Sequence, residues 1–297
     1  MTAHWKIVAW PAALALLFWV LTRAGGIDPE RLAGLEPDPD NGEWAFHAGG
    51  CASCHGADLA GGLEMDTPFG VFRVPNISPH PEAGIGDWET VDFANAMLRG
   101  SSADGSHYYP AFPYASYARM KLQDVVDLKA WLDSYPPNTR QVADHELAFP
   151  WNLRRGLGLW KRRYLDAAPV AVIVDETAEI ERGRYLVEAL GHCGECHTPR
   201  DRLGGPEHSQ WLAGATSPEG EGRVPNITPH EDGLADWSAR DIAYYLKSGF
   251  TPDFDTVGGS MVKVQENMAL LPDSDRAAIA AYLKAVPARP DPAGASP

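Results

Sequence analysis

The chain has 297 residues, of which 44% are hydrophobic and 22% are charged, and its formal net charge at pH 7 is −15. This acidic balance excludes nucleic-acid binding by any ordinary route, because the phosphate backbone repels a negatively charged protein. The same charge favours fast, salt-sensitive encounter with a basic face of a protein partner.

The first predicted element is an uncharged run of sixteen residues, 7–22, between Lys6 and Arg23. A transmembrane helix needs about 20 residues, so the run is slightly short. Snorkelling of the two flanking basic side chains extends it. Tryptophans suited to a membrane interface lie near its ends, namely Trp5, Trp10 and Trp19. We therefore expect residues 5–23 to form one transmembrane helix and residues 24–40 to form a linker.

A cleaved signal peptide is the alternative interpretation of this segment. Its apolar part is slightly long for that purpose, and Thr22-Arg23-Ala24 is a weak cleavage site. Both interpretations predict that the rest of the chain is exported.

A first folded unit is expected over residues 41–140. Its landmarks, in order, are a helix opening at Gly42, the sequence CASCH at 51–55, the phrase RVPNISPH at 73–80, and amphipathic segments at 91–100 and 124–132. The apolar residues of these segments recur at three-to-four spacing, and the first segment ends on a glycine, as helices do. No long stretch alternates with period two, so the unit is expected to be mostly helical.

The segment 141–178 is expected to link this unit to a second one. Part of it, 149–165, concentrates five of the 25 basic residues among tryptophans and leucines; the five are Arg154, Arg155, Lys161, Arg162 and Arg163. Such a segment suits contact with anionic lipid headgroups or with a partner. The alternative is a strap between the domains whose arginines neutralise acidic groups.

A second unit repeats the landmarks of the first over residues 179–287. They are a helix opening at Gly183, CGECH at 193–197, RVPNITPH at 223–230, and amphipathic segments at 239–249 and 275–283. About eight extra residues separate CGECH from the phrase that follows, which is typical of a loop insertion in a duplicated domain. The remaining residues, 288–297, are rich in Pro, Ala and Gly and are expected to be disordered.

The motif CxxCH, present in both units, predicts covalent attachment of haem c. On a helical turn the two cysteines face the same way and can form thioethers with the two vinyl groups of one haem, and the histidine then reaches the iron. The first haem is assigned Cys51, Cys54 and His55, and the second is assigned Cys193, Cys196 and His197.

Three other uses of these cysteines are disfavoured. A thioredoxin-like motif needs a βαβ setting, which the sequence does not show. A structural zinc site needs all four cysteines together, whereas each pair belongs to its own repeat. Disulfides leave the histidine that ends both motifs unexplained.

The distal iron ligands are sought among the six methionines. Met120 and Met261 follow His55 and His197 at nearly equal separations, and each precedes a closing helix. This favours both as second axial ligands, with Met as a core filler as the alternative. Met268 competes with Met261.

The two methionine segments are not equivalent. Counted from Gly100 and Gly249, the counterpart of Met261 is Phe112 rather than Met120. His107 is therefore an alternative ligand of the first haem, and it would give a lower reduction potential, since methionine ligation raises the potential.

The repeated phrase predicts the surroundings of each haem. A proximal histidine usually donates its second ring N–H to a carbonyl, and Pro75 and Pro225 suit that role because φ is locked and no N–H competes. The predicted donors to haem propionates are Asn76, Trp88, Arg200, Asn226 and Trp237. The alternative is that the phrase is only a turn and the tryptophans belong to the core.

Over residues about 40–287 the chain resembles the multihaem cytochrome c subunits of membrane-bound alcohol, aldehyde and sugar dehydrogenases. The stretches that carry the resemblance are GGCASCHG, VPNISPH, ANAMLRG, YYPAFPYASYARM, GHCGECHTPR and VPNITPH. The resemblance implies two tandem class I cytochrome c-like domains, an electron-relay role, and axial ligation by Met120 and Met261. Those subunits have three CxxCH motifs and this chain has two, so the resemblance does not identify the partner.

We therefore expect a dihaem cytochrome c of the bacterial inner membrane, anchored by one helix, with its domains in the periplasm. It is expected to take electrons from a periplasmic dehydrogenase subunit and pass them to quinone, another cytochrome or an oxidase. Two irons with His and Met ligands leave no open site, so no enzymatic activity is expected. The alternatives are a dihaem peroxidase, with the first haem shedding its distal ligand, and a cytochrome subunit of a haem–copper oxidase.

Overall fold

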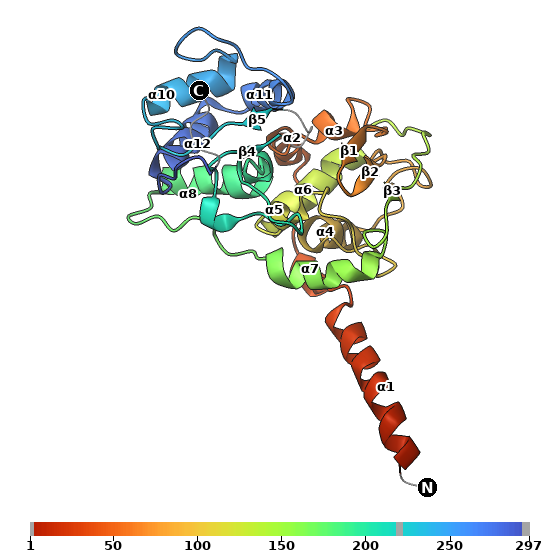
Figure 1. Ribbon diagram of the computed structural model, residues 1–297. Helices are drawn as coiled ribbons and strands as arrows, with labels where there is room; N and C mark the ends of the chain where they lie inside the picture. The colour runs from red at the N-terminus through yellow and green to blue at the C-terminus, as the bar shows by residue number, and fades with distance from the viewer. Residues whose placement is uncertain (1–2, 218–221, 293–297) are drawn as a thin grey trace.

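The computed structural model describes residues 3–217 and 222–292, and the side chains of residues 1–11 are not among those described. The expected interfacial side chains Trp5, Lys6 and Trp10 therefore lie outside the described part. Two mostly helical units pack against each other, and one helix projects away from them (Figure 1). The mostly helical, two-unit organisation predicted from the repeat is confirmed.

The projecting helix is α1 (Ala3–Leu21). Among the described residues, no helix has both the length and the apolar character needed to cross a membrane. The transmembrane helix expected over residues 5–23 is therefore not found.

The first unit contains five helices and three short strands, with a short helix before them. In chain order these are η1 (Pro29–Leu32), α2 (Pro39–Ala48), α3 (Cys51–His55), β1 (Glu64–Thr67), β2 (Gly70–Arg73), α4 (Thr90–Arg99), α5 (Tyr114–Tyr117), α6 (Leu122–Asp133) and β3 (Glu146–Leu147).

The second unit follows two elements of the connecting segment, η2 (Arg154–Gly156) and α7 (Leu157–Tyr164). Its own elements are α8 (Ala178–Arg184), the π-helical segment η3 (Tyr185–Leu190), α9 (Gly194–His197), η4 (His208–Gln210), β4 (Ala215–Thr216), β5 (Arg223–Val224), α10 (Ala239–Ser248), α11 (Met261–Leu270) and α12 (Asp273–Ala285).

In each unit the first and the last helix cross at a glycine. Helix α2 packs on α6, and α8 packs on α12. A Cβ on Gly42 would lie 2.1 Å from the carbonyl oxygen of Asp127, and one on Gly183 would lie 1.9 Å from that of Ala278. Only glycine permits so close a crossing. The buried apolar residues of the two units form one continuous core.

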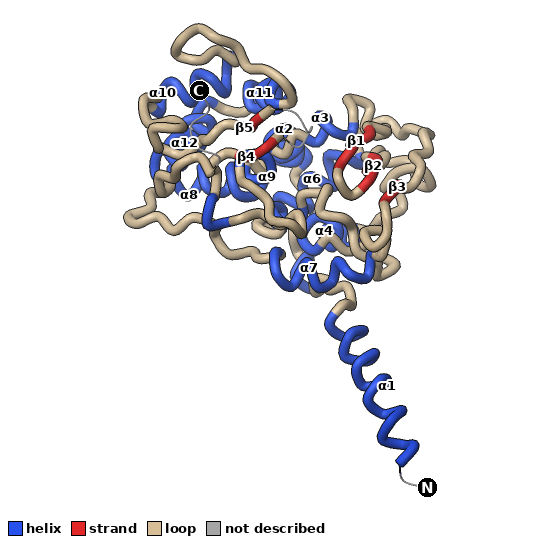
Figure 2. The backbone as a smooth tube through the Cα atoms, in the orientation of Figure 1, coloured by secondary structure: helices blue, strands red, loops and turns tan. Residues whose placement is uncertain are grey.

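The strands were not expected, and they are few and short (Figure 2). Strands β1, β2 and β3 form an antiparallel sheet in which Met65 pairs with Phe72 and Val71 with Glu146, and β4 pairs with β5. Two to four residues give too short an alternation to be recognised from sequence. Strands β2 and β5 lead directly to the two repeated phrases, which gives these hairpins a role in the haem sites.

Part of the expected disordered tail is ordered. The carbonyl of Arg289 accepts a hydrogen bond from Asn226, and Asp291 forms an ion pair with Arg223. Residues 288–292 are therefore held on the second unit, and residues 293–297 lie outside the described part.

Candidate functional site

Each CxxCH motif lies on a short helix that follows the first helix of its unit. Cys51 to His55 form α3, and α9 runs from Gly194 to His197 (Figure 2). No disulfide joins any of the four cysteines. The two cysteines of each motif are therefore on one helical turn and are available for thioethers with a single haem.

Both proximal histidines contact the carbonyl of the proline in the repeated phrase. Nδ1 of His55 lies 2.8 Å from the oxygen of Pro75, and Nδ1 of His197 lies 2.8 Å from that of Pro225. An imidazole that donates from Nδ1 presents a lone pair at Nε2, and neither Nε2 makes a hydrogen bond within residues 3–217 and 222–292. This is the orientation that an iron ligand requires.

Burial keeps these ligand groups neutral. It lowers the pKa of His55 to about 4 and also lowers the pKa of His197, although the proline carbonyls act in the opposite direction. Burial likewise raises the pKa of the Cys51 and Cys193 thiols to about 12. A neutral imidazole is the form that binds iron.

A glycine with positive φ follows each attachment motif, and in the first unit it makes room for the proline carbonyl. Gly61 has φ of +65°, and a Cβ there would lie 2.3 Å from the Pro75 oxygen. Its N–H donates to the carbonyl of His55 at 2.8 Å. In the second unit Gly214, with φ of +93°, donates in the same way to the carbonyl of His197 at 2.9 Å. The loop after each motif is thus bonded to the ligand residue itself.

The asparagines of the phrase donate to backbone carbonyls. Asn76 donates to the carbonyls of Asn138 and Arg140 at 2.8 and 3.1 Å, and Asn226 donates to that of Arg289 at 2.7 Å. The expected role of both residues as propionate donors stays a prediction. Each asparagine ties the phrase to the segment that follows the closing helix of its unit.

Arg200 is also engaged by the protein. Its guanidinium forms an ion pair with Glu195 and donates to the carbonyl of Gly204 at 2.8 Å. Arg200 thus contacts the residue between Cys193 and Cys196, and its expected contact with a propionate stays a prediction.

The two tryptophans do not use their indole N–H groups in contacts with other described residues. Trp88 is half-buried and stacks on Tyr108, and Trp237 is half-buried beside Tyr245. In the part of the chain that the structure describes, neither indole N–H donates a hydrogen bond. Their role as propionate donors stays a prediction.

The methionine candidates occupy different settings. Met120 is 6% exposed, follows α5 and belongs to the core, whereas Met261 is half-buried at the start of α11. Its competitor Met268 is 5% exposed and lies near the C-terminal end of the same helix, α11. Phe112, the positional counterpart of Met261, lies within an aromatic cluster with Tyr108, Tyr114 and Tyr117. These positions leave Met120 and Met261 as predicted ligands.

His107, the alternative ligand of the first haem, is held elsewhere. Its Nε2 lies 2.8 Å from the carbonyl of Thr22, at the end of α1, and its ring is 2% exposed. Since Nε2 donates to a carbonyl, that nitrogen has no lone pair for iron.

The two attachment motifs lie against each other. Nε2 of His192 is 3.3 Å from the carbonyl of Gly49, and each of these residues precedes a CxxCH motif. The ring of His192 also packs edge-on against Tyr117, with centroids 5.6 Å apart. A Cβ on Gly49 would lie 3.8 Å from the carbonyl of Leu190, so the backbones are nearly in contact.

Further contacts across the interface are reciprocal. Trp44 of the first unit donates to Asp275 of the second at 2.8 Å, and Tyr185 of the second donates to Asp124 of the first. In each repeat the first helix thus reaches the closing helix of the other repeat. The duplicated units are related by an approximate twofold arrangement at this interface.

In each motif, a residue between the two cysteines also forms a hydrogen bond across the interface. Ser116 donates to Glu195 at 2.7 Å, and Asn267 donates to the hydroxyl of Ser53 at 3.0 Å. Ser116 belongs to the segment before Met120, and Asn267 belongs to α11, which Met261 begins. The predicted ligand segment of each unit therefore contacts the haem motif of the other.

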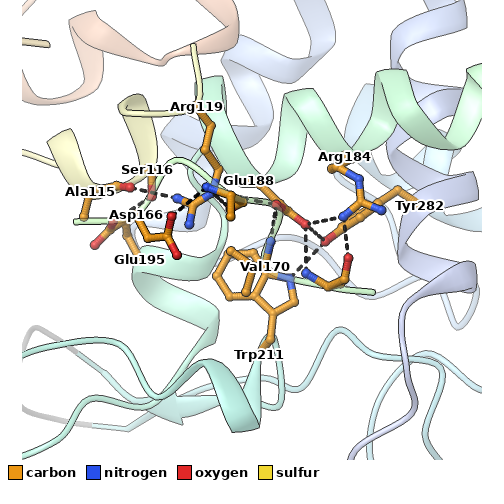
Figure 3. Close-up of polar contacts among 12 residues, drawn as sticks. Ala115, Ser116, Arg119, Asp166, Val170, Arg184, Glu188, Glu195, Trp211 and Tyr282 are labelled. Carbon is orange, nitrogen blue, oxygen red and sulfur yellow. Dashed lines mark hydrogen bonds and ion pairs between the residues drawn. The ribbon is translucent and has the colours of Figure 1, made fainter. Parts of the chain in front are cut away.

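A buried carboxylate supports this interface from the second unit. Glu188 on η3 is 1% exposed and accepts hydrogen bonds from Val170, Arg184 and Tyr282, as Figure 3 shows. Arg119, which precedes Met120, lies 3.8 Å from it across the interface. These donors hold the Glu188 carboxyl group in place close to the first unit's predicted ligand segment.

Two haem-attachment sites of the cytochrome c type are therefore present in the chain. Residues 39–136 and 180–287 match the cytochrome c family, so the chain belongs to that family and carries two covalently attached haem c groups. The family is one of electron carriers.

Curated relatives extend this comparison. The chain is 55% identical over 278 residues to a diheme cytochrome c-type protein of Cereibacter sphaeroides, and the match covers 90% of this chain and 92% of that one. It is 36% identical to the fructose dehydrogenase cytochrome subunit of Gluconobacter japonicus, over 92% of this chain and 58% of that subunit. It is 34% identical to the alcohol dehydrogenase (quinone) cytochrome c subunit of Gluconobacter oxydans, over 84% of this chain and 55% of that subunit. This chain thus spans little more than half of the two dehydrogenase subunits.

The interface residues were missed by the sequence reasoning. The sequence did hold a signal. An aromatic residue stands at the same place in each repeat, Trp44 and Tyr185, and so does an aspartate, Asp124 and Asp275. That signal does not reveal that the pairs cross between units.

Proposed function

We propose that this dihaem cytochrome c relays electrons from a dehydrogenase on the periplasmic side of the bacterial inner membrane to quinone, another cytochrome or an oxidase. In this proposal α1 attaches the protein to the membrane. The observation that carries it is the contact between the two attachment motifs at Gly49 and His192. Two centres held this close suit electron transfer from one to the other within the chain.

Each bound haem supplies an iron that changes between the ferric and ferrous states by one electron. The residues of the chain hold these centres still. Pro75 and Pro225 orient the histidines, and the interface bonds of Trp44 and Tyr185 hold one unit against the other. Methionine at both distal positions would leave no position for a substrate, which supports relay rather than catalysis.

The dehydrogenase partner is supported by the names of two relatives, which are cytochrome subunits of fructose and alcohol dehydrogenases. The chain's charge of −15 suits a basic docking face on that partner. Membrane attachment is supported by the apolar residues of α1, because Leu14, Leu16 and Leu17 are all more than half exposed.

Purification of the full chain from its native membrane in a mild detergent tests this function. We expect a dehydrogenase subunit to co-purify, and its substrate to reduce both haems. Peroxide turnover at a first haem without the far-red iron–sulfur band would contradict the proposal and favour a peroxidase. Co-purification with a haem–copper oxidase alone would identify the third alternative.

A further inference from the structure

Large apolar side chains are exposed on the connecting segment that lies beside the point where α1 leaves the folded units. Five of them, between 38% and 77% exposed, form what we call the collar: Phe149, Trp151, Leu153, Leu159 and Leu203. Four belong to η2, α7 or the turn before them, and Leu203 is joined to α7 by the hydrogen bond that Trp160 donates to its carbonyl at 3.0 Å. Figure 1 shows α7 at the base of α1.

The end of α1 is fixed to this base. Arg155 donates to the carbonyl of Trp19 at 2.8 Å, Arg162 to that of Leu21 at 2.7 Å, and His107 to that of Thr22 at 2.8 Å. The last carbonyls of a helix have no partners within it, and cations stabilise its C-terminal end. Helix α1 is therefore capped by the units, and its direction relative to the collar is set.

The basic side chains of the connecting segment are largely used in this way. Arg154 donates to the carbonyl of His107 at 3.2 Å, and the buried Lys161 donates to that of Gly100 at 2.6 Å. These contacts are with backbone carbonyls of α1 and the first unit, whereas the strap interpretation expected the arginines to neutralise acidic groups. Arg162 and Arg163 of α7 stay exposed next to the apolar residues of the collar.

The collar is continuous with the exposed face of α1. The large apolar side chains between positions 14 and 20 are 42% to 62% exposed. The guanidinium of Arg155 lies over the ring of Trp19, 5.6 Å from the ring centroid. An exposed apolar surface of this kind marks an interaction site. Tryptophan is enriched at the boundary between lipid and water, and arginine suits it because its stem can lie in lipid while its charge stays in water.

We propose that the collar lies in the interfacial zone of a lipid bilayer, with α1 in the lipid and both haem units held at a fixed orientation above it. The proposal rests on membrane attachment through α1 and adds a second contact. A bilayer is favoured over a protein partner because the surface combines a projecting helix, whose described side chains are apolar and exposed, with exposed apolar side chains beside its base. Lipid molecules can cover such a shape, whereas a protein partner would need a complementary cavity.

Spin labels in the holoprotein test this contact. Leu153→Cys and Leu159→Cys carry labels on the collar, and Phe254→Cys carries the matched control on an 88% exposed side chain of the second unit. The full chain is reconstituted in vesicles of phosphatidylcholine and phosphatidylglycerol. We expect the ratio of oxygen to nickel-chelate collisions to be severalfold higher at positions 153 and 159 than at 254.

Each other outcome overturns the proposal in a distinguishable way. If the protein floats with vesicles but the collar labels are as accessible to nickel as position 254, only the collar contact fails. If it does not float, membrane attachment fails as well. If the collar labels are shielded from both reagents, a second copy of the chain covers them instead of lipid. The haem absorbance of each variant shows that it is folded.

Discussion

Ser116 on α5 of the first unit donates its hydroxyl hydrogen to Glu195, 2.7 Å away in the second haem motif. Glu195 stands between Cys193 and Cys196, and Met120 follows Ser116 in the same segment. The predicted ligand segment of one haem therefore holds the attachment motif of the other.

Replacing this hydroxyl should weaken the protein more than replacing its counterpart. Ser116→Ala is expected to lower the free energy of unfolding by about 1.5–3 kcal/mol, because its bond is to a charged carboxylate. Ser53→Ala removes a neutral bond from Asn267 and is expected to cost about 0.5–1.5 kcal/mol. Denaturant unfolding of the two holoproteins measures both. Equal losses would show that the charge of Glu195 does not contribute.

The methionine assignments predict a spectroscopic loss. Met120→Ala or Met261→Ala should each remove roughly half of the far-red iron–sulfur band of the oxidised protein, since each removes one of two thioether ligands. The matched controls are Met97→Ala and Met268→Ala, because both side chains are buried in the same units. If Met97→Ala lost the band and Met120→Ala kept it, Met97 would be the ligand of the first haem. The same comparison between Met268 and Met261 applies to the second haem. The reduction potential of the affected haem should fall, because methionine ligation raises it.

Gly61→Ala should disturb the bond that orients His55. The added methyl would lie 2.3 Å from the Pro75 oxygen, so the carbonyl must move. With a weaker hydrogen bond the imidazole is less basic, and the potential of the first haem should rise. Gly105→Ala is the control, because it also has a positive φ but no atom within 4 Å. The control should lose only about 1–2 kcal/mol of stability for the left-handed backbone and keep its potential.

Glu188→Gln should be among the costliest single substitutions in the second unit. It removes the charge that faces Arg184 and Arg119 in a site with 1% exposure, and breaking a buried pair costs about 3–5 kcal/mol. Glu176 also pairs with Arg184 but its side chain is 28% exposed. Glu176→Gln is therefore expected to cost about 1 kcal/mol or less. Thermal unfolding of the two variants compares their stabilities, and similar losses would argue against a larger contribution from the buried pairs of Glu188.

Lowering the pH should weaken the contact that His107 of the first unit makes with Thr22 at the end of α1. Burial, together with the charges of Lys161 and Arg155, lowers the pKa of His107 below its usual 6.5, and its Nδ1 is buried without a partner. Between the folded pKa and 6.5 the unfolded chain binds a proton that the native protein does not. Stability is therefore complete above pH 6.5 and is lost as the pH falls through the folded pKa.

His107→Gln provides the comparison for this effect, since glutamine keeps a donor for Thr22 and does not titrate. Between pH 7 and pH 5, the free energy of unfolding of the native protein should fall by more than that of the variant. Parallel pH profiles would show that His107 does not carry the effect. The comparison is needed because burial also lowers the pKa of His145, His192 and His208.

Much of the helical framework could be predicted, because it follows from local patterns. The amphipathic segments at 91–100 and 239–249 became α4 and α10, and both end at the predicted glycines. The histidine-to-proline contacts followed from chemistry, since a proximal imidazole needs an acceptor and proline offers an unhindered one.

The partners of Asn76 and Arg200 could not be predicted in this way. A side-chain amide or guanidinium bonds equally well to a propionate, a carboxylate or a carbonyl, and the choice depends on which group the fold brings near. For Asn76 that group is a carbonyl more than sixty residues away in sequence. The pairing of Trp44 with Asp275 is similarly a product of packing between units.

The stacking of the two attachment motifs sets an order for biogenesis. Thioether formation requires each CxxCH segment to be reached by the enzyme that joins haem to it. Once Tyr117 and the carbonyl of Gly49 lie on His192, that approach is covered from the side of the opposite repeat. We therefore expect haem attachment to precede full closure of the interface, so that the two repeats complete their folding together.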